Sequence, residues 1–281
     1  MKMAPKRSGA IENEARMDLL RAEHITKRYG DRTILKDVSV RLEEGELVSL
    51  LGLSGSGKTT LFHVLSGLIP PEEGRVLLKG EDVTAKPGKV SYMLQKDLLL
   101  AHKKVIDNVA LPLLLAGRKK KEAREEAAPY FEDFGLAGTE MLYPAQLSGG
   151  MRQRAAFLRT YLSAVAASGE HRLKGAQKPS GAALLDEPFS ALDTITKSQM
   201  HDWYLDVMEK ISLSTLFITH DIDEALVLSD RIYILTGSPG EIRDEIRILP
   251  ERRERKDFNM TGEFLAYKKQ IRDILERQQT Q

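Results

Sequence analysis

The sequence predicts an α/β fold, in which a mainly parallel β-sheet is flanked by helices. Short apolar runs typical of β-strands alternate with helical stretches from about residue 20 to residue 235, and this alternation favours a parallel sheet with helices on both faces. A glycine-rich turn at residues 52–57 directly joins an apolar run to a helical stretch. Residues 97–166 are helical in pattern, which indicates a helical subdomain inserted into the α/β core.

Periodicity and turn residues place the individual elements. Apolar, β-rich runs between turn residues predict strands at residues 22–26, 35–42, 47–51, 75–79, 89–94, 182–185, 214–219 and 231–235. Helical apolar spacing predicts helices at residues 59–68, 119–134, 197–210, 222–229 and 263–278, with a further helix that begins near Gly149. The polar residues 168–181 predict a surface loop. We therefore expect a leader (1–19), one main domain (20–240) and a C-terminal extension with a helix (241–281).

Composition excludes several classes of protein. The 42 basic and 41 acidic residues give a net charge of +1, so no overall field attracts nucleic acid, and we expect no nucleic-acid partner. The chain has no cysteine, which excludes disulfides and thiolate chemistry. No apolar run reaches the ~18 residues that a membrane span needs, and the first 19 residues lack the apolar stretch of a signal peptide. We expect a cytoplasmic protein with a disordered leader.

The glycine-rich turn matches the phosphate-binding pattern G-x-x-x-x-G-K-[ST], in the strand-to-helix context that the pattern requires. Its glycines let successive backbone N–H groups face one anion at the start of a helix. Lys58 is expected to reach the β- and γ-phosphates of a nucleotide, and the Thr59 hydroxyl to ligate Mg²⁺. No Asn-Lys pair, which a guanine-reading motif would need, occurs in the chain, so ATP is favoured. The expected binding residues are Gly52, Ser54, Gly55, Ser56, Gly57, Lys58, Thr59 and Thr60.

Two carboxylates follow the buried strand expected at residues 182–185. In the sequence LLDEP, Asp186 is expected to hold Mg²⁺, and Glu187 to activate the attacking water as a general base. Taken alone, this pattern is equally compatible with a strand end followed by an acidic turn. The rest of the motif set decides between the two interpretations.

A second glycine-rich segment, LSGGMRQR at residues 147–154, opens a predicted helix. Ser148 is a good N-cap, and Gly149 and Gly150 expose backbone N–H groups, which makes a second phosphate-binding surface. Two such surfaces in one subunit are explained if two copies pair head to tail, so that each segment closes on the nucleotide of the other copy.

Together, GLSGSGKTT, LSGGMRQR, LLDEP, SALD and THD stand in an order that resembles the motif set of the ATP-binding subunit of an ABC transporter. The resemblance covers roughly residues 20–240. It implies a P-loop NTPase core with a mainly parallel sheet, an antiparallel β subdomain and an inserted α-helical subdomain. It also implies that two copies enclose two Mg²⁺-ATP molecules and that hydrolysis reopens the dimer.

The resemblance implies roles for further residues. Tyr29 would stack on adenine, with an ordinary strand-end tyrosine as the alternative. Gln95 would contact Mg²⁺ and the attacking water, with a solvated glutamine as the alternative. His220 would hydrogen-bond the γ-phosphate and orient Glu187, and Asp193 would cross the dimer interface. Ser148, Gly149 and Gly150 would bind the ATP of the partner copy.

A separate ATPase chain without a fused membrane domain resembles bacterial importers, in the branch that serves nitrate, sulfonate, taurine or pyrimidine-type precursors. This implies an integral membrane permease as partner, an external substrate-binding protein, and a peripheral position on the inner face of the membrane. Residues 96–109 are the candidate permease contact, although the same stretch is equally compatible with the inner face of the helical subdomain. A soluble ABC ATPase with a non-transport partner is the alternative function.

Overall fold

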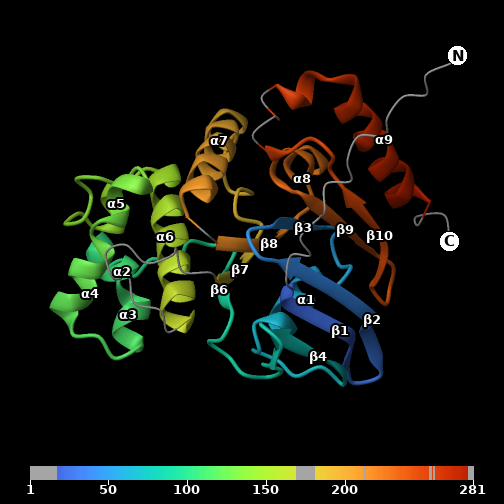
Figure 1. Ribbon diagram of the computed structural model, residues 1–281, viewed down its shortest axis with the longest axis horizontal. Helices are drawn as coiled ribbons and strands as arrows, with labels where there is room; N and C mark the ends of the chain where they lie inside the picture. Colours follow the sequence, from blue (N-terminus) through green and yellow to red (C-terminus); the bar gives the residue numbers. More distant parts are fainter. Residues whose placement is uncertain (1–17, 169–180, 212, 253–254, 256, 278–281) are drawn as a thin grey trace, which may run out of the picture.

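Figure 1 shows the computed structural model of the chain, which describes residues 18–168, 181–211, 213–252, 255 and 257–277. Two sheets lie side by side, and a group of helices, α2 to α6, lies beside them at the left of the view. The predicted leader up to residue 17 and the predicted surface loop from residue 169 to 180 lie outside the described residues.

The smaller sheet is antiparallel and has the strand order β2-β1-β4-β5. Strand β1 pairs with β2 on one side and with β4 on the other. This confirms the antiparallel β subdomain, although β1 begins two residues before the predicted domain boundary at residue 20. The strands are β1 (Asp18–Tyr29), β2 (Arg32–Glu43), β4 (Glu73–Leu78) and β5 (Glu81–Asp82).

The larger sheet is mainly parallel, as predicted, with the order β10-β9-β3-β8-β7-β6. Strand β3 runs parallel to β8 and β9, β7 runs parallel to β6 and β8, and β10 alone in this sheet pairs antiparallel. Because parallel strands end at the same edge, the segments that follow β3, β7 and β8 meet there. The strands are β3 (Leu47–Leu51), β6 (Ser91–Met93), β7 (Gly181–Asp186), β8 (Leu213–Thr219), β9 (Arg231–Thr236) and β10 (Glu241–Arg247).

Helices pack on the sheets or form the helical subdomain. The long helix α6 contacts β6 and β7 and joins that subdomain to the sheet. The subdomain contains α2 (Val105–Val109), α3 (Leu111–Leu115), α4 (Lys120–Ala127), α5 (Tyr130–Asp133), the 3₁₀ turn Pro144–Gln146 and α6 (Gly149–Ser168). The remaining helices are α1 (Lys58–Leu65), α7 (Thr194–Lys210), α8 (Ile222–Leu228) and α9 (Gly262–Glu276), with a 3₁₀ turn at Phe258–Met260.

Two helix predictions are corrected. The single helix expected over residues 119–134 is two helices, because Pro129 interrupts the pattern and begins α5 instead of continuing α4. Helix α7 begins at Thr194, three residues before the predicted start. The Asp193 carboxylate accepts hydrogen bonds from the backbone N–H groups of Ile195 and Thr196, and this cap sets the beginning of the helix.

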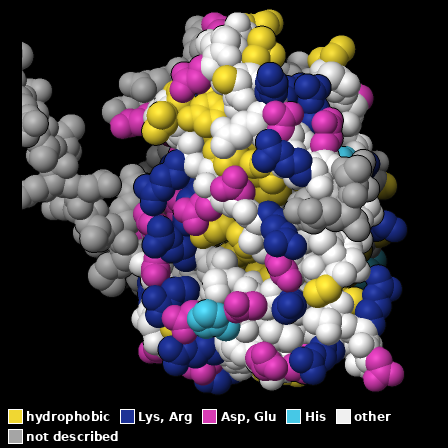
Figure 2. Space-filling model, turned by 90° about the vertical axis from the view of Figure 1, so that its right-hand side faces the viewer, with side chains coloured by type: hydrophobic (Ala, Val, Ile, Leu, Met, Phe, Trp, Pro, Cys, Tyr) yellow, Lys and Arg dark blue, Asp and Glu magenta, His cyan; other side chains and the backbone are white. Residues whose placement is uncertain are grey.

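The segment after Gly240 continues the main sheet before it leaves it. Strand β10 pairs with β9 along its whole length, so the sheet extends beyond the predicted boundary at residue 240. The chain then returns as α9, which buries Phe264 and Ile271 in a cluster shared with α8. On the face at the right of Figure 1, basic and acidic side chains are interspersed and hydrophobic side chains show between them (Figure 2). Within the described ranges, no helix has both the length and the apolar composition for crossing a membrane.

Candidate functional site

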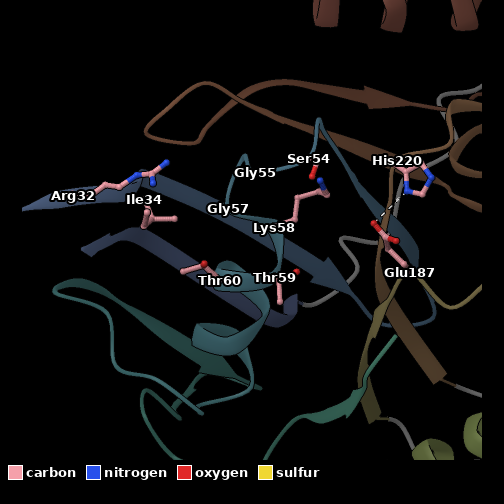
Figure 3. A pocket seen from close by; sticks show the side chains of 10 residues that line it. All are labelled: Arg32, Ile34, Ser54, Gly55, Gly57, Lys58, Thr59, Thr60, Glu187 and His220. Carbon is pink, nitrogen blue, oxygen red and sulfur yellow. Dashed lines mark hydrogen bonds and ion pairs between the residues drawn. The ribbon is translucent and has the colours of Figure 1, made fainter. Parts of the chain in front are cut away.

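A cavity of about 630 Å³ lies where β3, β7 and β8 end. Figure 3 shows that residues from the glycine-rich loop and α1 form one side of it, and that Glu187 and His220 face it from the neighbouring strand ends. The residues that line it are Arg32, Ile34, Ser54, Gly55, Gly57, Lys58, Thr59, Thr60, Glu187 and His220.

The loop needs glycine at two positions for different reasons. A Cβ at Gly52 would lie 2.2 Å from the carbonyl oxygen of Leu235 in β9, so no side chain fits there. Gly57 has φ +94°, and a Cβ at this position would lie 2.8 Å from Leu35 Cδ2. The loop therefore packs against both sheets at once. Gly55 has φ +83° with open space around it.

Lys58 is folded back on the loop. Its Nζ donates hydrogen bonds to the carbonyl oxygens of Gly52 and Leu53, both at 2.8 Å, and the residue is only 7% exposed. Burial lowers the pKa of Lys58, whereas the negative charges of Glu187 and Asp186 act in the opposite direction. The ammonium group is thus held by two backbone carbonyl oxygens of the loop, within the electrostatic influence of both carboxylates.

Asp186 ends β7 and is 8% exposed. Its Oδ2 accepts a hydrogen bond of 3.1 Å from the Tyr92 hydroxyl, and the Thr59 side chain lies close enough to influence the carboxylate. Burial raises the pKa of Asp186 and the charge of Glu187 adds to the rise, while the Tyr92 and Thr59 side chains oppose it. Burial and the same carboxylate also raise the pKa of Tyr92 well above its usual range. No role was predicted for Tyr92 from the sequence.

Glu187 is held between two of the predicted site residues. Its Oε2 accepts a hydrogen bond of 3.0 Å from Gln95 Nε2, and its Oε1 lies 3.2 Å from His220 Nδ1 (Figure 3). The backbone of Glu187 has φ +45°, and its N–H donates to the Ile218 carbonyl at 3.2 Å. A non-glycine residue in the left-handed region is uncommon, and this conformation turns the side chain out of the strand direction toward the cavity.

The donor set fits magnesium bound together with a nucleotide. Among the residues that the structure describes, no group of three or more His, Cys, Asp and Glu side chains forms a metal-binding cluster. The Asp186 carboxylate and the Thr59 hydroxyl supply adjacent oxygen atoms. Mg²⁺ commonly takes one or two protein oxygens and completes its shell with phosphates and water. These residues match that pattern.

Ser148, Gly149, Gly150 and Asp193 are not among the residues that line the cavity. Ser148 is exposed at the start of α6, where its Oγ accepts a hydrogen bond of 3.2 Å from the Met151 N–H. A Cβ at Gly149 or Gly150 would meet its nearest neighbours only at 3.8–3.9 Å, which is ordinary contact. Asp193 is exposed at the start of α7. The packing of this chain therefore does not by itself require glycine at the start of α6.

Tyr29 lies at the end of β1 with 53% of its surface exposed, and the Lys27 ammonium stands 5.4 Å from its ring centroid. Arg32 and Ile34, in the adjacent strand β2, line the cavity. Neither residue was predicted from the sequence. Arg32 is the cross-strand partner of Tyr29 in the β1–β2 hairpin. Because Tyr29 was a predicted site residue, its expected pairing with Arg32 in a hairpin could have identified Arg32.

Helix α6 contacts the segments that follow Gln95 and Glu187. Arg159 donates to the carbonyl oxygens of Leu98 (2.9 Å) and Asp97 (2.5 Å), and Arg152 pairs with the Asp97 carboxylate at 3.4 Å. Gln153 Nε2 donates to the carbonyl oxygen of Pro188. Helix α6, which Ser148 directly precedes, is thus hydrogen-bonded to the segment after Gln95 and to the residue after Glu187. These contacts were not predicted.

Comparison with known proteins gives the family of the chain. The family model described as ABC transporter matches residues 35–166. The formylaminopyrimidine import ATP-binding protein ThiZ of Halalkalibacterium halodurans is 41% identical over 92% of this chain and 96% of its own length. The taurine import ATP-binding protein TauB of Escherichia coli O157:H7 is 36% identical over 81% of this chain and 84% of its own length.

Solved structures give the same result. A dimeric structure of a bacterial ABC transporter cassette superposes with a TM-score of 0.65 at 27% identity, over 83% of this chain and all of the other. The same cassette in a dimeric post-hydrolysis state bound to ADP and phosphate superposes with a TM-score of 0.63 at 26% identity, over the same shares. The chain belongs to the ABC transporter family, as an ATP-binding subunit similar to those of import systems.

Proposed function

We propose that this chain binds Mg²⁺-ATP in the cavity, hydrolyses it as a head-to-tail dimer and thereby drives import through a membrane permease. The observation that carries the proposal is the placement of Glu187. Its carboxylate lies between Gln95 and His220 and faces the same cavity as Lys58 and the glycine-rich loop. A base, its two positioning partners and a phosphate-binding loop are thus assembled at one point.

The loop and α1 suit a triphosphate. Helix α1 begins at Lys58 after Gly57, which offers no side chain to cap the first N–H groups, so these donors and the positive end of the helix dipole are available to an anion. Lys58 is already aimed at the loop and would exchange carbonyl oxygens for phosphate oxygens. We expect Tyr29 to stack on the adenine and Ser54, Ser56 and Thr60 to contact the nucleotide.

In hydrolysis, Glu187 would accept a proton from water as that water attacks the γ-phosphorus, and the bond to the bridging oxygen of ADP would break. Gln95 Nε2 and His220 Nδ1 hold the two carboxylate oxygens of Glu187, which restricts the carboxylate to one orientation. Bound magnesium, held by Asp186 and Thr59 with Gln95 beside it, would neutralise charge on the phosphates.

The second half of each site is proposed to come from a partner copy. Ser148, Gly149 and Gly150 present an exposed helix start, which suits contact with the γ-phosphate bound by the other copy. Asp193 would meet the partner across the interface. A related cassette forms a dimer in its solved structure, which supports this arrangement.

We also propose that the segment after Gln95 contacts the permease, so that the dimer works at the inner face of the membrane together with an external substrate-binding protein. Within this segment, residues 96–109, Leu98 is 51% exposed, as an apolar contact for a partner would be. Arg159 of α6 holds Asp97 and Leu98, so this segment would move with the helix that meets the partner copy. The names of the relatives include import of formylaminopyrimidine, aliphatic sulfonates, nitrate and taurine.

The test is the Glu187→Gln variant. Loss of the base should slow ATP turnover by about 10²- to 10⁴-fold while ATP still binds, so the nucleotide-bound dimer should accumulate. Its mass is measured by light scattering after size exclusion, with and without Mg²⁺-ATP. A shift from monomer to dimer only with ATP is expected. Wild-type turnover in the variant would contradict the role of Glu187, and a monomer that binds ATP would contradict self-pairing.

A further inference from the structure

A group of charged side chains outside the cavity joins α7 to α8. Lys197, in the first turn of α7, places its Nζ 2.6 Å from Asp221 Oδ2 and 2.8 Å from Glu224 Oε2. The Glu224 side chain is 3% exposed and that of Lys197 is 20% exposed. The ring of His201, one turn further along α7, lies 3.5 Å from the same Glu224 oxygen. One lysine therefore balances a buried carboxylate and a half-buried one.

Each end of this group adjoins a proposed site residue. Asp221 directly follows His220, and its other oxygen, Oδ1, caps α8 by accepting hydrogen bonds from the N–H groups of Asp223 (2.9 Å) and Glu224 (3.2 Å). At the other end, the Lys197 N–H donates to the Asp193 carbonyl at 2.8 Å. Asp193 is thus connected to His220 through the first turn of α7 and the contact between Lys197 and Asp221.

We propose that Lys197 is a positioning residue that couples Asp193 at the dimer interface to His220 at the cavity. This inference rests on the proposed function. When a partner copy contacts Asp193 and shifts the start of α7, Lys197 carries the shift to Asp221, and so to the backbone of His220. The partner copy would thereby hold His220 against Glu187, which it meets at 3.2 Å in the single chain.

Other contacts hold α8 without reaching Asp193. Lys268 of α9 pairs with Asp223 at 2.6 Å, but both side chains are about half exposed. Arg255 donates to the carbonyl oxygens of Leu226, Val227 and Ser229 at the far end of α8. These contacts fix α8 to the C-terminal segment. Lys268 therefore provides a matched control for Lys197. Both lysines pair with a carboxylate of α8, but Lys268 does so from α9 and not from α7.

The experiment compares Lys197→Met, Lys197→Arg and Lys268→Met in the full chain by kcat and KM for ATP, by ATP binding and by thermal unfolding. Misplacing His220 should lower kcat on the order of 10- to 100-fold and leave the ATP Kd within about twofold. Lys197→Arg should restore most of the rate, and Lys268→Met should match the wild type. If Lys197→Met does not fold, Lys197→Met/Glu224→Gln removes the unpaired buried charge and takes its place.

A second step separates coupling from general support. In a His220→Ala background, Lys197→Met should cause no further loss of rate, measured as single turnover with protein in excess so that slow rates are resolved. An equal loss in both backgrounds, or wild-type kcat in folded Lys197→Met, would overturn the coupling. If the wild-type chain itself does not hydrolyse ATP, the proposed function fails instead, and the two failures are thereby distinguished.

Discussion

The cavity edge and the start of α6 are both glycine-rich and both serve phosphate in the proposed function, yet their structures differ. At the cavity, Asp186 and Glu187 are tied by hydrogen bonds to Tyr92, Gln95 and His220 of the same chain. The exposed residues at the start of α6 and of α7 bond mainly to their own helix ends. The difference teaches that the cavity side is organised within the chain, whereas the starts of α6 and α7 are exposed, as the proposed contact with a partner copy would require.

The sharpest test of this difference is complementation. Lys58→Ala removes the cavity half of a site, and Ser148→Arg blocks the open half, so each variant alone should lose on the order of 100-fold or more in ATP turnover. A mixed dimer contains one intact site, since the undamaged halves meet across the interface. Equal amounts should therefore recover up to about a quarter of wild-type turnover.

Turnover is measured on each variant and on the mixture at the same total protein concentration. Each variant alone is therefore present at twice its concentration in the mixture, which controls for simple concentration effects. If the mixture is no more active than its components, the two halves do not come from different copies.

A smaller effect separates the glycines of the two regions. Gly52→Ala places a Cβ 2.2 Å from the Leu235 carbonyl oxygen, so the backbone must move, and we expect a loss of about 2–3 kcal/mol in the free energy of unfolding. Gly149→Ala meets nothing closer than 3.9 Å and should be neutral or stabilising by up to about 1 kcal/mol, while ATP-dependent dimerisation weakens. Urea unfolding gives both free energies. Equal destabilisation by the two variants would contradict the distinction between a packed loop and an open one.

The smallest effect concerns the stability of the helical subdomain that carries the open half. Arg124 donates to both oxygens of Asp107, at 2.8 and 2.7 Å, and its hydrogen bond lowers the pKa of Asp107. Because the folded-state pKa is lowered, the stabilisation is complete above the ordinary pKa of about 4 and is lost as the pH falls below it. Asp107→Asn should cost about 1 kcal/mol at pH 7, and the difference from wild type should shrink in acid. A pH-independent difference in unfolding free energy would contradict this assignment.

The sequence predicted what depends on neighbours along the chain. The strand, loop and helix around Lys58 follow from an apolar run, glycines and helical spacing within 20 residues, and the structure has these elements. The parallel order of the core follows from the alternation of strands and helices. The break at Pro129 was also local, and the sequence analysis missed it. Tyr92 and the arginines of α6 carried no local signal, because their partners lie far away in the sequence.

By itself, then, the sequence determined the family, the fold class and most of the residues that line the cavity, since these depend on short motifs and on periodicity. It did not determine Arg32 and Ile34, which also line the cavity. Only the tertiary structure decided that Gly52 must be glycine, because the obstructing atom belongs to Leu235 in another strand. It also decided that Glu187 lies between Gln95 and His220, and that Lys197 reaches Asp221. Such contacts depend on how separate elements pack against one another, and no pattern along the chain records that packing.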